Sequence, residues 1–315
     1  MSSDNEPVAA DGRQPATMQL ATAKLDGRPT VVVASGSRCV ALRDLVGEGA
    51  SVPDELYELL AAWDEWRPVV MRAGAAIDQA PTREPEGWLV PVRPSKLICV
   101  GVNYHDHLAE MGGAPVPQFP YSFLKPVSTG LVASGTAVRL PLGPKMVDWE
   151  AELAIVIGSR LRGVRGPEVL NAVAGYTIYN DLSARDWIAS TRPPGIDWVI
   201  MKGYDDFSPI GPFVTPAEFV ADPQNLPIRC WVNDELKQDS STSQMIFGVQ
   251  AILEHLAGIM TLEAGDVIAT GTPAGVGFGS TPQQFLQPGD TVTVEVDGLG
   301  RLETYMVESS QGATT

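Results

Sequence analysis

Carboxylates alternate with other residues in one segment near the middle of the chain, which leads directly into an apolar run. Asp148, Glu150 and Glu152 are each separated by one residue, and Leu153–Ile157 follows as a candidate core strand. If that strand extends back to Asp148, its two-residue period puts all three carboxylates on one face. Carboxylates on one strand face repel one another unless water or a cation relieves the repulsion. A solvated face ordinarily explains such a pair, but the direct run into a core strand weakens that explanation.

A further carboxylate, Asp181, ends another apolar run, in the segment GYTIYND. Ligand-binding side chains commonly project from a turn that follows a strand. A carboxylate set without histidine or cysteine is typical of hard cations and predicts Mg²⁺, with Mn²⁺ or Ca²⁺ as alternatives. The cysteines Cys39, Cys99 and Cys230 are far apart in the sequence. This spacing argues against structural zinc and predicts reduced thiols.

The overall charge limits the partners of the chain. The net charge is -16 and the pI is about 4.5, whereas nucleic acid requires clustered basic residues. Neither nucleic acid nor an anionic membrane surface is therefore an expected partner, and no run approaches the roughly 20 apolar residues that cross a bilayer. Residues 1–17 lack the features of a secretory signal and are expected, like residues 310–315, to be disordered tails of a cytoplasmic protein.

The distribution of apolar residues predicts two domains. Residues 18–92 are expected to form a small N-terminal α+β domain that ends in a linker rich in Pro and Glu. Its expected elements are strands at Thr30–Ala34 and Arg38–Ala41 and a helix at Asp54–Trp66.

Residues 93–309 are expected to form a mainly β domain with some helix. One helix is predicted at Gln244–Met260. Strands and helices do not alternate regularly, which argues against a doubly wound parallel sheet. The predicted strands are Leu97–Val102, Leu153–Ile157, Ile228–Val232, Asp266–Thr270 and Thr291–Val296.

A histidine and a glutamate follow the first of these strands, in a segment that predicts a short helix. His107 and Glu110 are three residues apart and therefore share a helix face. A carboxylate beside an imidazole fixes its tautomer and raises its basicity, which suits a water-activating pair. The residues alone favour an ordinary surface pair. They also favour an ordinary surface position for His105.

Five segments resemble the fumarylacetoacetate hydrolase family, over roughly residues 95–308 and in the family's order. They are DWEAELAIVIG, AGYTIYNDLSARD, MKGYDDFSPIGPF, QDSSTSQMIF and GDVIATGTPAGVG. The resemblance implies that Glu150, Glu152 and Asp181 bind the metal ion, with Asp148 adjacent to them. It also implies a mixed β-sandwich or roll as the fold and a homodimer as the assembly.

The same resemblance gives roles to other residues. It implies that His107 and Glu110, in a motif similar to NYxDHxxE, activate the attacking water. Lys202 would bind the oxo group of the substrate or stabilise an enolate or oxyanion. Arg185 would hold a substrate carboxylate or bridge the acidic cluster, and Thr272 would contact the substrate.

One position departs from the family pattern. Many members carry Gln three residues after the Arg of the ARD motif, where this chain has Ile188. The neighbouring residues 190–197, STRPPGID, resemble an insertion in the pocket region. Gln238 and Thr242 fall in a motif that lines the site in relatives. The difference at Ile188 leaves the substrate open.

The implied activity is a metal-dependent hydrolase that cleaves a C–C bond of an acylpyruvate-like or diketo acid. A water activated by His107 and Glu110 would attack, and a metal-stabilised enolate would leave. The alternatives are a decarboxylase, isomerase or hydratase of a 2-oxo-dioate in the breakdown of aromatic compounds. A metal-stabilised scaffold that binds a ligand without turnover is a further alternative.

Overall fold

The computed structural model describes residues 17–47, 51–113, 115–188 and 195–309. The two predicted tails, apart from Thr17, and most of the run at residues 190–197 lie outside this part of the chain. No helix in the described part combines the length and apolar character that crossing a membrane requires.

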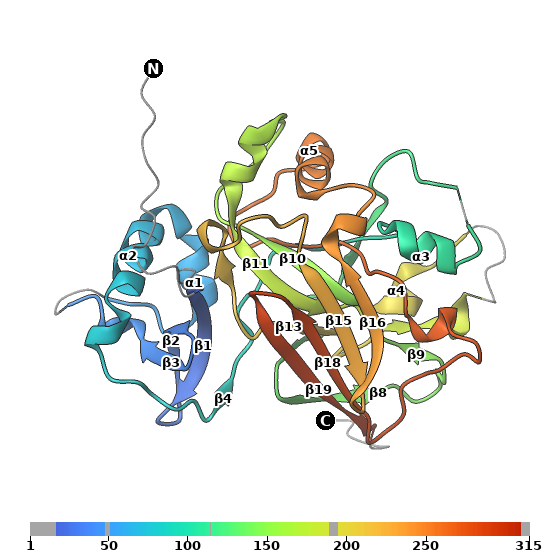
Figure 1. Ribbon diagram of the computed structural model, residues 1–315, viewed down its shortest axis with the longest axis horizontal. Coiled ribbons are helices and arrows are strands. Elements are labelled where there is room, and N and C mark those ends of the chain that lie inside the picture. The colour runs from blue at the N-terminus through green and yellow to red at the C-terminus, as the bar shows by residue number, and fades with distance from the viewer. Residues whose placement is uncertain (1–16, 48–50, 114, 189–194, 310–315) are drawn as a thin grey trace.

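A small antiparallel sheet with the strand order β3-β2-β1-β4 lies at the N-terminal end of the chain (Figure 1). Its strands are β1 (Gln19–Leu25), β2 (Arg28–Ser35), β3 (Arg38–Ala41) and β4 (Gly87–Trp88). Asp26 and Gly27 form the tight turn between β1 and β2 with φ angles of 50° and 73°, which suits the twist of a hairpin. The strands predicted for β2 and β3 are confirmed, and β1 was not predicted.

The helical stretch predicted near Asp54–Trp66 is confirmed in type, but it is divided and extends further. Two helices, α1 (Leu56–Ala61) and α2 (Trp63–Ala75), meet at Ala62. The apolar spacing that motivated the prediction is real, because its members are buried on both sides of the break: Leu56, Leu59, Leu60 and Trp63. The ring of Trp63 packs directly against Gly158 of the larger domain. A Cβ at Gly158 would lie only 2.4 Å from Trp63 Cδ1. The hydrophobic core is thus continuous between the N-terminal sheet and the rest of the chain.

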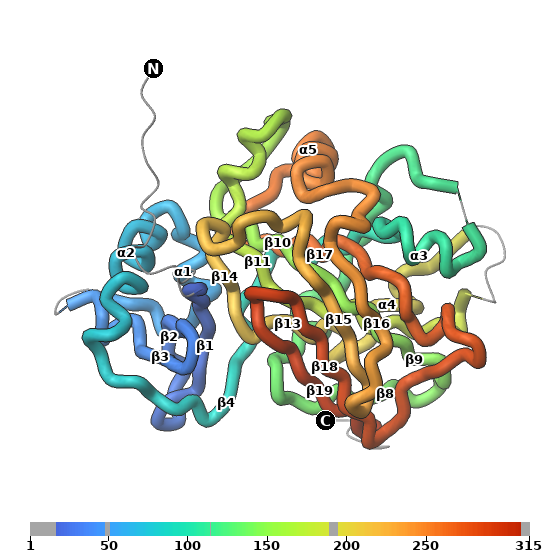
Figure 2. The backbone as a smooth tube through the Cα atoms, in the orientation of Figure 1, coloured from blue at the N-terminus to red at the C-terminus, as the bar shows by residue number. Residues whose placement is uncertain are grey.

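Two curled sheets form the larger part of the molecule, and the predicted mainly β architecture is confirmed. The larger sheet has the order β6-β5-β17-β10-β11-β13-β7, with β14 paired to β11. Its strands are β5 (Leu97–Val100), β6 (Ser122–Lys125), β7 (Leu131–Ala133), β10 (Ala151–Ile157), β11 (Val173–Asn180), β13 (Ser208–Ile210), β14 (Thr215–Pro216) and β17 (Val267–Ala269). Figure 2 shows β10 and β11 side by side at its centre.

The second sheet packs against the first and has the order β16-β15-β18-β19-β8. Its strands are β8 (Thr136–Leu140), β15 (Pro227–Val232), β16 (Glu235–Ser241), β18 (Thr291–Val296) and β19 (Gly300–Glu308). Alternating burial along β15 and β18 follows from the two-residue period of a strand with one face in the core.

Helix α5 (Val249–Ile259) starts later than the predicted Gln244–Met260. Asn103 accounts for the difference, because its backbone carbonyl accepts a hydrogen bond from Ile246 N and its Oδ1 accepts one from Phe247 N. These bonds hold the backbone outside a helix until Gly248. Within the described residues the remaining α-helices are α3 (His105–Glu110) and α4 (Trp198–Lys202).

The acidic segment is not the single strand that the sequence predicted. Strand β9 (Val147–Asp148) pairs with β12 (Ser183–Ala184), whereas β10 begins only at Ala151 and pairs with β11. Side chains interrupt the ladder, because Asp148 Oδ1 accepts from Trp149 N at 2.9 Å and Asn180 Oδ1 accepts from Glu150 N at 3.0 Å. The carboxylates at 148, 150 and 152 therefore do not share one strand face.

Candidate functional site

Three buried carboxylates converge where β10 and β11 lie together. Glu150 and Glu152 flank Ala151, which pairs with Asn180, so the neighbouring Asp181 lies beside them. Asp181 N also donates to Glu150 O at 2.9 Å. One ligand atom from each carboxylate falls within 4.8 Å of the others, and the three residues are 6%, 1% and 1% exposed. The predicted cluster is present, and its buried oxygen donors suit a hard divalent cation.

Basic side chains contact this cluster from several sides. Lys202, at the end of α4, donates to Glu150 Oε2 at 2.8 Å and to Asp181 Oδ2. Lys125, from β6, donates to Asp181 Oδ1 at 2.6 Å. The sequence interpretation missed Lys125, which is 5% exposed, although a lysine at the end of a run such as SFLK is a weak signal for a buried charge.

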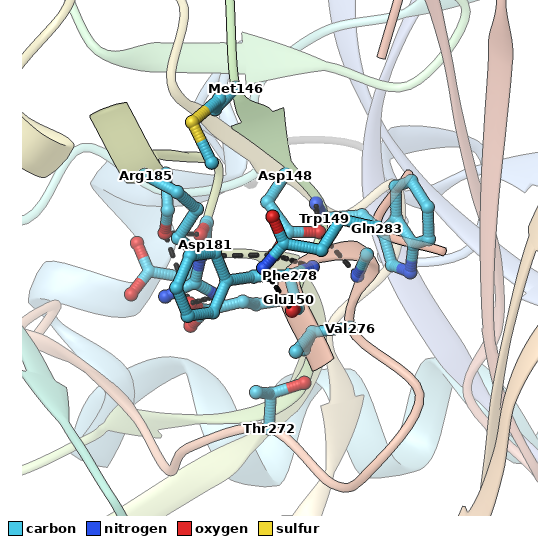
Figure 3. Close-up of polar contacts among 12 residues, drawn as sticks. Met146, Asp148, Trp149, Glu150, Asp181, Arg185, Thr272, Val276, Phe278 and Gln283 are labelled. Atoms are coloured by element: carbon cyan, nitrogen blue, oxygen red, sulfur yellow. Dashed lines mark hydrogen bonds and ion pairs between the residues drawn. The ribbon is translucent and has the colours of Figure 1, made fainter. Parts of the chain in front are cut away.

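Arg185 lies between two carboxylates, as Figure 3 shows. Its Nε donates to Asp148 Oδ2 at 2.9 Å and its Nη2 donates to Glu150 Oε1 at 2.6 Å. Asp148 is also fixed by the backbone N–H groups of Gly277 and Phe278. Two roles were expected for Arg185, and this geometry corresponds to the bridge across the acidic cluster. The side chain also lines the cavity, where a substrate carboxylate could reach it.

The electrostatics differ between the two glutamates. Burial alone would raise the pKa of Glu150, but Lys202 and Arg185 outweigh it and lower that pKa to about 2. Burial raises the pKa of Glu152 well above its ordinary value, and the nearby charges of Asp181 and Glu150 add to this. The carboxylate of Glu152 accepts Gly271 N at 2.8 Å and contacts no lysine or arginine among the described residues. With Asp148 included, four carboxyl groups face three cationic side chains, Lys125, Arg185 and Lys202. One negative charge is therefore left without a partner when Glu152 is ionised, and a divalent cation would neutralise it.

Cation binding is expected to release a proton and to strengthen as the pH rises. Without a cation the raised pKa of Glu152 keeps its carboxyl protonated above the ordinary carboxyl range, and a cation must displace that proton. Calorimetric titration with Mn²⁺ in buffers of different ionisation enthalpy measures the proton release directly. An affinity that is independent of pH, with no proton released, would contradict the placement of the cation at Glu152.

The predicted histidine–glutamate pair is formed. His107 Nδ1 lies 3.0 Å from Glu110 Oε2 on α3, and Glu110 Oε1 accepts Gly275 N at 2.9 Å. A Cβ at Gly279 would lie 2.4 Å from the carboxyl carbon of Glu110, so only glycine leaves room for it. Ser240 ties the start of α3 to β16 through its bond to Asp106 at 2.5 Å. His107 is therefore held in a fixed orientation at 6% exposure.

A cavity of about 160 Å³ brings these groups together. Its polar lining includes the three carboxylates, His107, Lys202, Arg185 and Thr272. Gln238 supports Thr272 from outside the cavity, because its Nε2 donates to Thr272 Oγ1 at 2.9 Å. Thr242 instead accepts a hydrogen bond from Leu226 N and does not line the cavity. Ile188 lies in its wall, with other apolar side chains.

Comparison with known proteins identifies a family and several relatives. Residues 96–307 match the family described as fumarylacetoacetate (FAA) hydrolase C-terminal. The sequence is 38% identical, over 268 residues, to a Xenopus laevis protein named "Oxaloacetate tautomerase fahd2, mitochondrial". That alignment covers 84% of this chain and 82% of the relative.

Solved structures of the same family share the fold. A fumarylacetoacetate hydrolase from Exiguobacterium antarcticum has a TM-score of 0.78 and is 33% identical, with 93% of this chain and 100% of that chain covered. A maleylpyruvate hydrolase from Sphingobium sp. SYK-6, in complex with manganese(II) ion and pyruvate, has a TM-score of 0.72 and is 30% identical, with the same coverage. The predicted fold type is confirmed by these similarities.

Proposed function

Because the chain belongs to the fumarylacetoacetate hydrolase family, we propose that it is a divalent-cation-dependent enzyme that interconverts the keto and enol forms of a small 2-oxo acid. The observation that carries this proposal is the buried cluster of Glu150, Glu152 and Asp181, which shares one cavity with His107. The tautomerase name of the Xenopus relative and the manganese–pyruvate complex of the Sphingobium hydrolase support it.

The acidic cluster supplies the electrophilic end of the cavity. Glu150, Glu152 and Asp181 would hold the cation, with Mg²⁺ as the expected ion and Mn²⁺ or Ca²⁺ as alternatives. When bound, the cation supplies Lewis-acid chemistry that stabilises negative charge on the oxygens of a 2-oxo acid. Lys202 donates hydrogen bonds to Glu150 and Asp181. Its fixed positive charge favours the enolate oxygen over the uncharged keto group.

His107 is the residue that moves the proton. Since a carboxylate only accepts hydrogen bonds, the contact with Glu110 assigns the N–H to Nδ1 and leaves Nε2 as the acceptor. No hydrogen bond to Nε2 is found among the described residues, and the side chain lines the cavity. The ring is thus arranged to take a proton from the carbon beside the oxo group and to return it.

Hydrolysis of a C–C bond in an acylpyruvate-like acid is the second candidate. The same histidine–glutamate pair is suited to deprotonate a water, and the Sphingobium neighbour is named a hydrolase. Release of pyruvate from acetylpyruvate would distinguish this reaction from simple enolisation. Arg185 and Thr272 remain proposed substrate contacts, and the homodimer and the cytoplasmic location remain predictions.

Replacing His107 with Gln is expected to lower the rate of keto–enol conversion by about 10²- to 10⁴-fold, the usual contribution of a general acid–base. The affinity for Mn²⁺ should stay within about twofold, because His107 is not in the carboxylate set. Ultraviolet absorbance of the enol form follows the conversion. His105→Gln on the same helix is the control, since His105 is exposed. Full activity of His107→Gln would contradict the proton-transfer role.

A further inference from the structure

The cavity has two chemically different ends. Its acidic end comes from the junction of β10 and β11, as described above. An apolar wall comes from β6, α4, the segments beside α4 and the residue that follows α3: Met111, Phe123, Ile188, Ile196, Trp198 and Met201. A substrate that places its carboxylate and oxo oxygens at the acidic end must therefore direct its other end towards this apolar wall.

A stacked aromatic pair forms part of the apolar wall. The rings of Phe123 and Trp198 are 4.3 Å apart and inclined by only 6°. Trp198 Nε1 donates to the hydroxyl of Tyr121 at 3.0 Å, so the one polar group of the indole is already satisfied. Lys202 Nζ lies 5.4 Å from the centroid of the Phe123 ring, so the apolar wall begins beside the acidic cluster that Lys202 contacts.

Two apolar side chains of this wall are unusually exposed. Met111 and Ile196 line the cavity but are 48% and 49% exposed. Apolar surface that lines a concave site is favourably buried when a ligand covers it. An apolar group on the substrate would gain this burial, whereas a hydrated group would not.

The basic residues that line the cavity contact its acidic cluster. The lysine and arginine side chains that line it, within the described part of the chain, are Lys202 and Arg185. Each is hydrogen-bonded to buried carboxylates. A second substrate carboxylate against the apolar wall would lose hydration and find no lysine or arginine there among the described residues, which is costly.

We infer that the site selects 2-oxo acids whose distal group is uncharged and apolar, and discriminates against 2-oxo dicarboxylates. The inference rests on the proposed function and adds the substrate class. The expected substrate preference of this chain therefore differs from the substrate named for its Xenopus relative, because oxaloacetate carries a second carboxylate.

A matched pair of substrates tests the inference. 2-Oxopentanoate and 2-oxoglutarate have the same chain length and differ only in a terminal methyl or carboxylate group. Exchange of the hydrogens beside the oxo group for solvent deuterium, measured by NMR with the full chain and Mg²⁺, reports enolisation of both. We expect kcat/KM to be at least about tenfold higher for 2-oxopentanoate, the scale of discrimination by one pocket contact.

A charge placed on the apolar wall should weaken or abolish the preference. Ile196→Lys supplies a cation at an exposed position of the wall, and should raise kcat/KM for 2-oxoglutarate relative to 2-oxopentanoate by about tenfold. Val199→Lys is the matched control, since Val199 is 70% exposed and does not line the cavity. It should leave the ratio unchanged.

Pyruvate separates the failure of this inference from the failure of the proposed function. Pyruvate has no distal group, so its exchange depends only on the acidic end and His107. Exchange of pyruvate together with equal or better exchange of 2-oxoglutarate than of 2-oxopentanoate would overturn the inference alone. If none of the three acids exchanges faster than with Mg²⁺ in buffer, both the proposed function and the inference are wrong.

Discussion

Glu152→Gln should lower kcat/KM for enolisation by roughly a thousandfold and yet stabilise the cation-free protein. The loss follows from the Lewis-acid contribution of a catalytic metal, which is several kcal/mol, where about 1.4 kcal/mol is tenfold in rate. The gain follows from the raised pKa of the Glu152 carboxyl, which burial and the neighbouring Asp181 and Glu150 cause. As the pH rises above the ordinary carboxyl pKa, the unfolded chain ionises first, and the cation-free folded state loses stability. A neutral amide removes this penalty.

Thermal unfolding with and without Mg²⁺ measures both effects in one experiment. The wild-type protein should gain in Tm on addition of Mg²⁺, whereas Glu152→Gln should start from a higher Tm in EDTA and gain little. Glu235→Gln is the control, because Glu235 is exposed on β16. A Mg²⁺-dependent increase in Tm that survives in Glu152→Gln would mean that the cation binds elsewhere.

Lys202→Met should destabilise the cation-free protein by about 3–5 kcal/mol, the usual cost of removing one partner of a buried ion pair. The ammonium of Lys202 is 3% exposed and contacts both Glu150 and Asp181. Its removal leaves these carboxylates close together with less positive charge between them. Activity should fall as well, because Lys202 provides part of the charge that favours the enolate.

Urea denaturation in EDTA measures the loss, with Lys24→Met as the control. Lys24 forms an exposed pair with Glu86, and such pairs contribute about 0–1 kcal/mol. Mg²⁺ should restore part of the stability of Lys202→Met, because the ion replaces some of the lost positive charge. An unchanged free energy of unfolding would show that Lys202 does not balance the cluster.

The residues of the acidic site could be predicted from their position beside apolar runs and from the family resemblance. An apolar run after Glu152 and another before Asp181 predicted two core strands, and their pairing brings the carboxylates together. The single face expected for Asp148, Glu150 and Glu152 was wrong because two side chains replaced the ladder bonds at 149–150. Hydrogen bonds that side chains accept from the backbone, whether from a neighbour such as Asp148 or from the distant Asn180, cannot be inferred from periodicity.

Other features depended on tertiary contacts. The buried role of Lys125 requires Asp181 and Phe207 O, which lie 56 and 82 residues away in the sequence. The delayed start of α5 depends on Asn103, which is similarly distant from it. The helix signal around Leu59 was correct in type, but a periodicity alone did not locate the break at Ala62.

The central claim is that the cation at Glu150, Glu152 and Asp181 makes this chain enolise a 2-oxo acid. Deuterium exchange into the methyl group of pyruvate, followed by NMR, tests it without regard to any later bond cleavage. The wild-type protein with Mg²⁺ should accelerate the exchange well beyond Mg²⁺ alone, and EDTA or Glu152→Gln should remove the acceleration. Exchange by the wild-type protein that is no faster than with Mg²⁺ alone would contradict the claim.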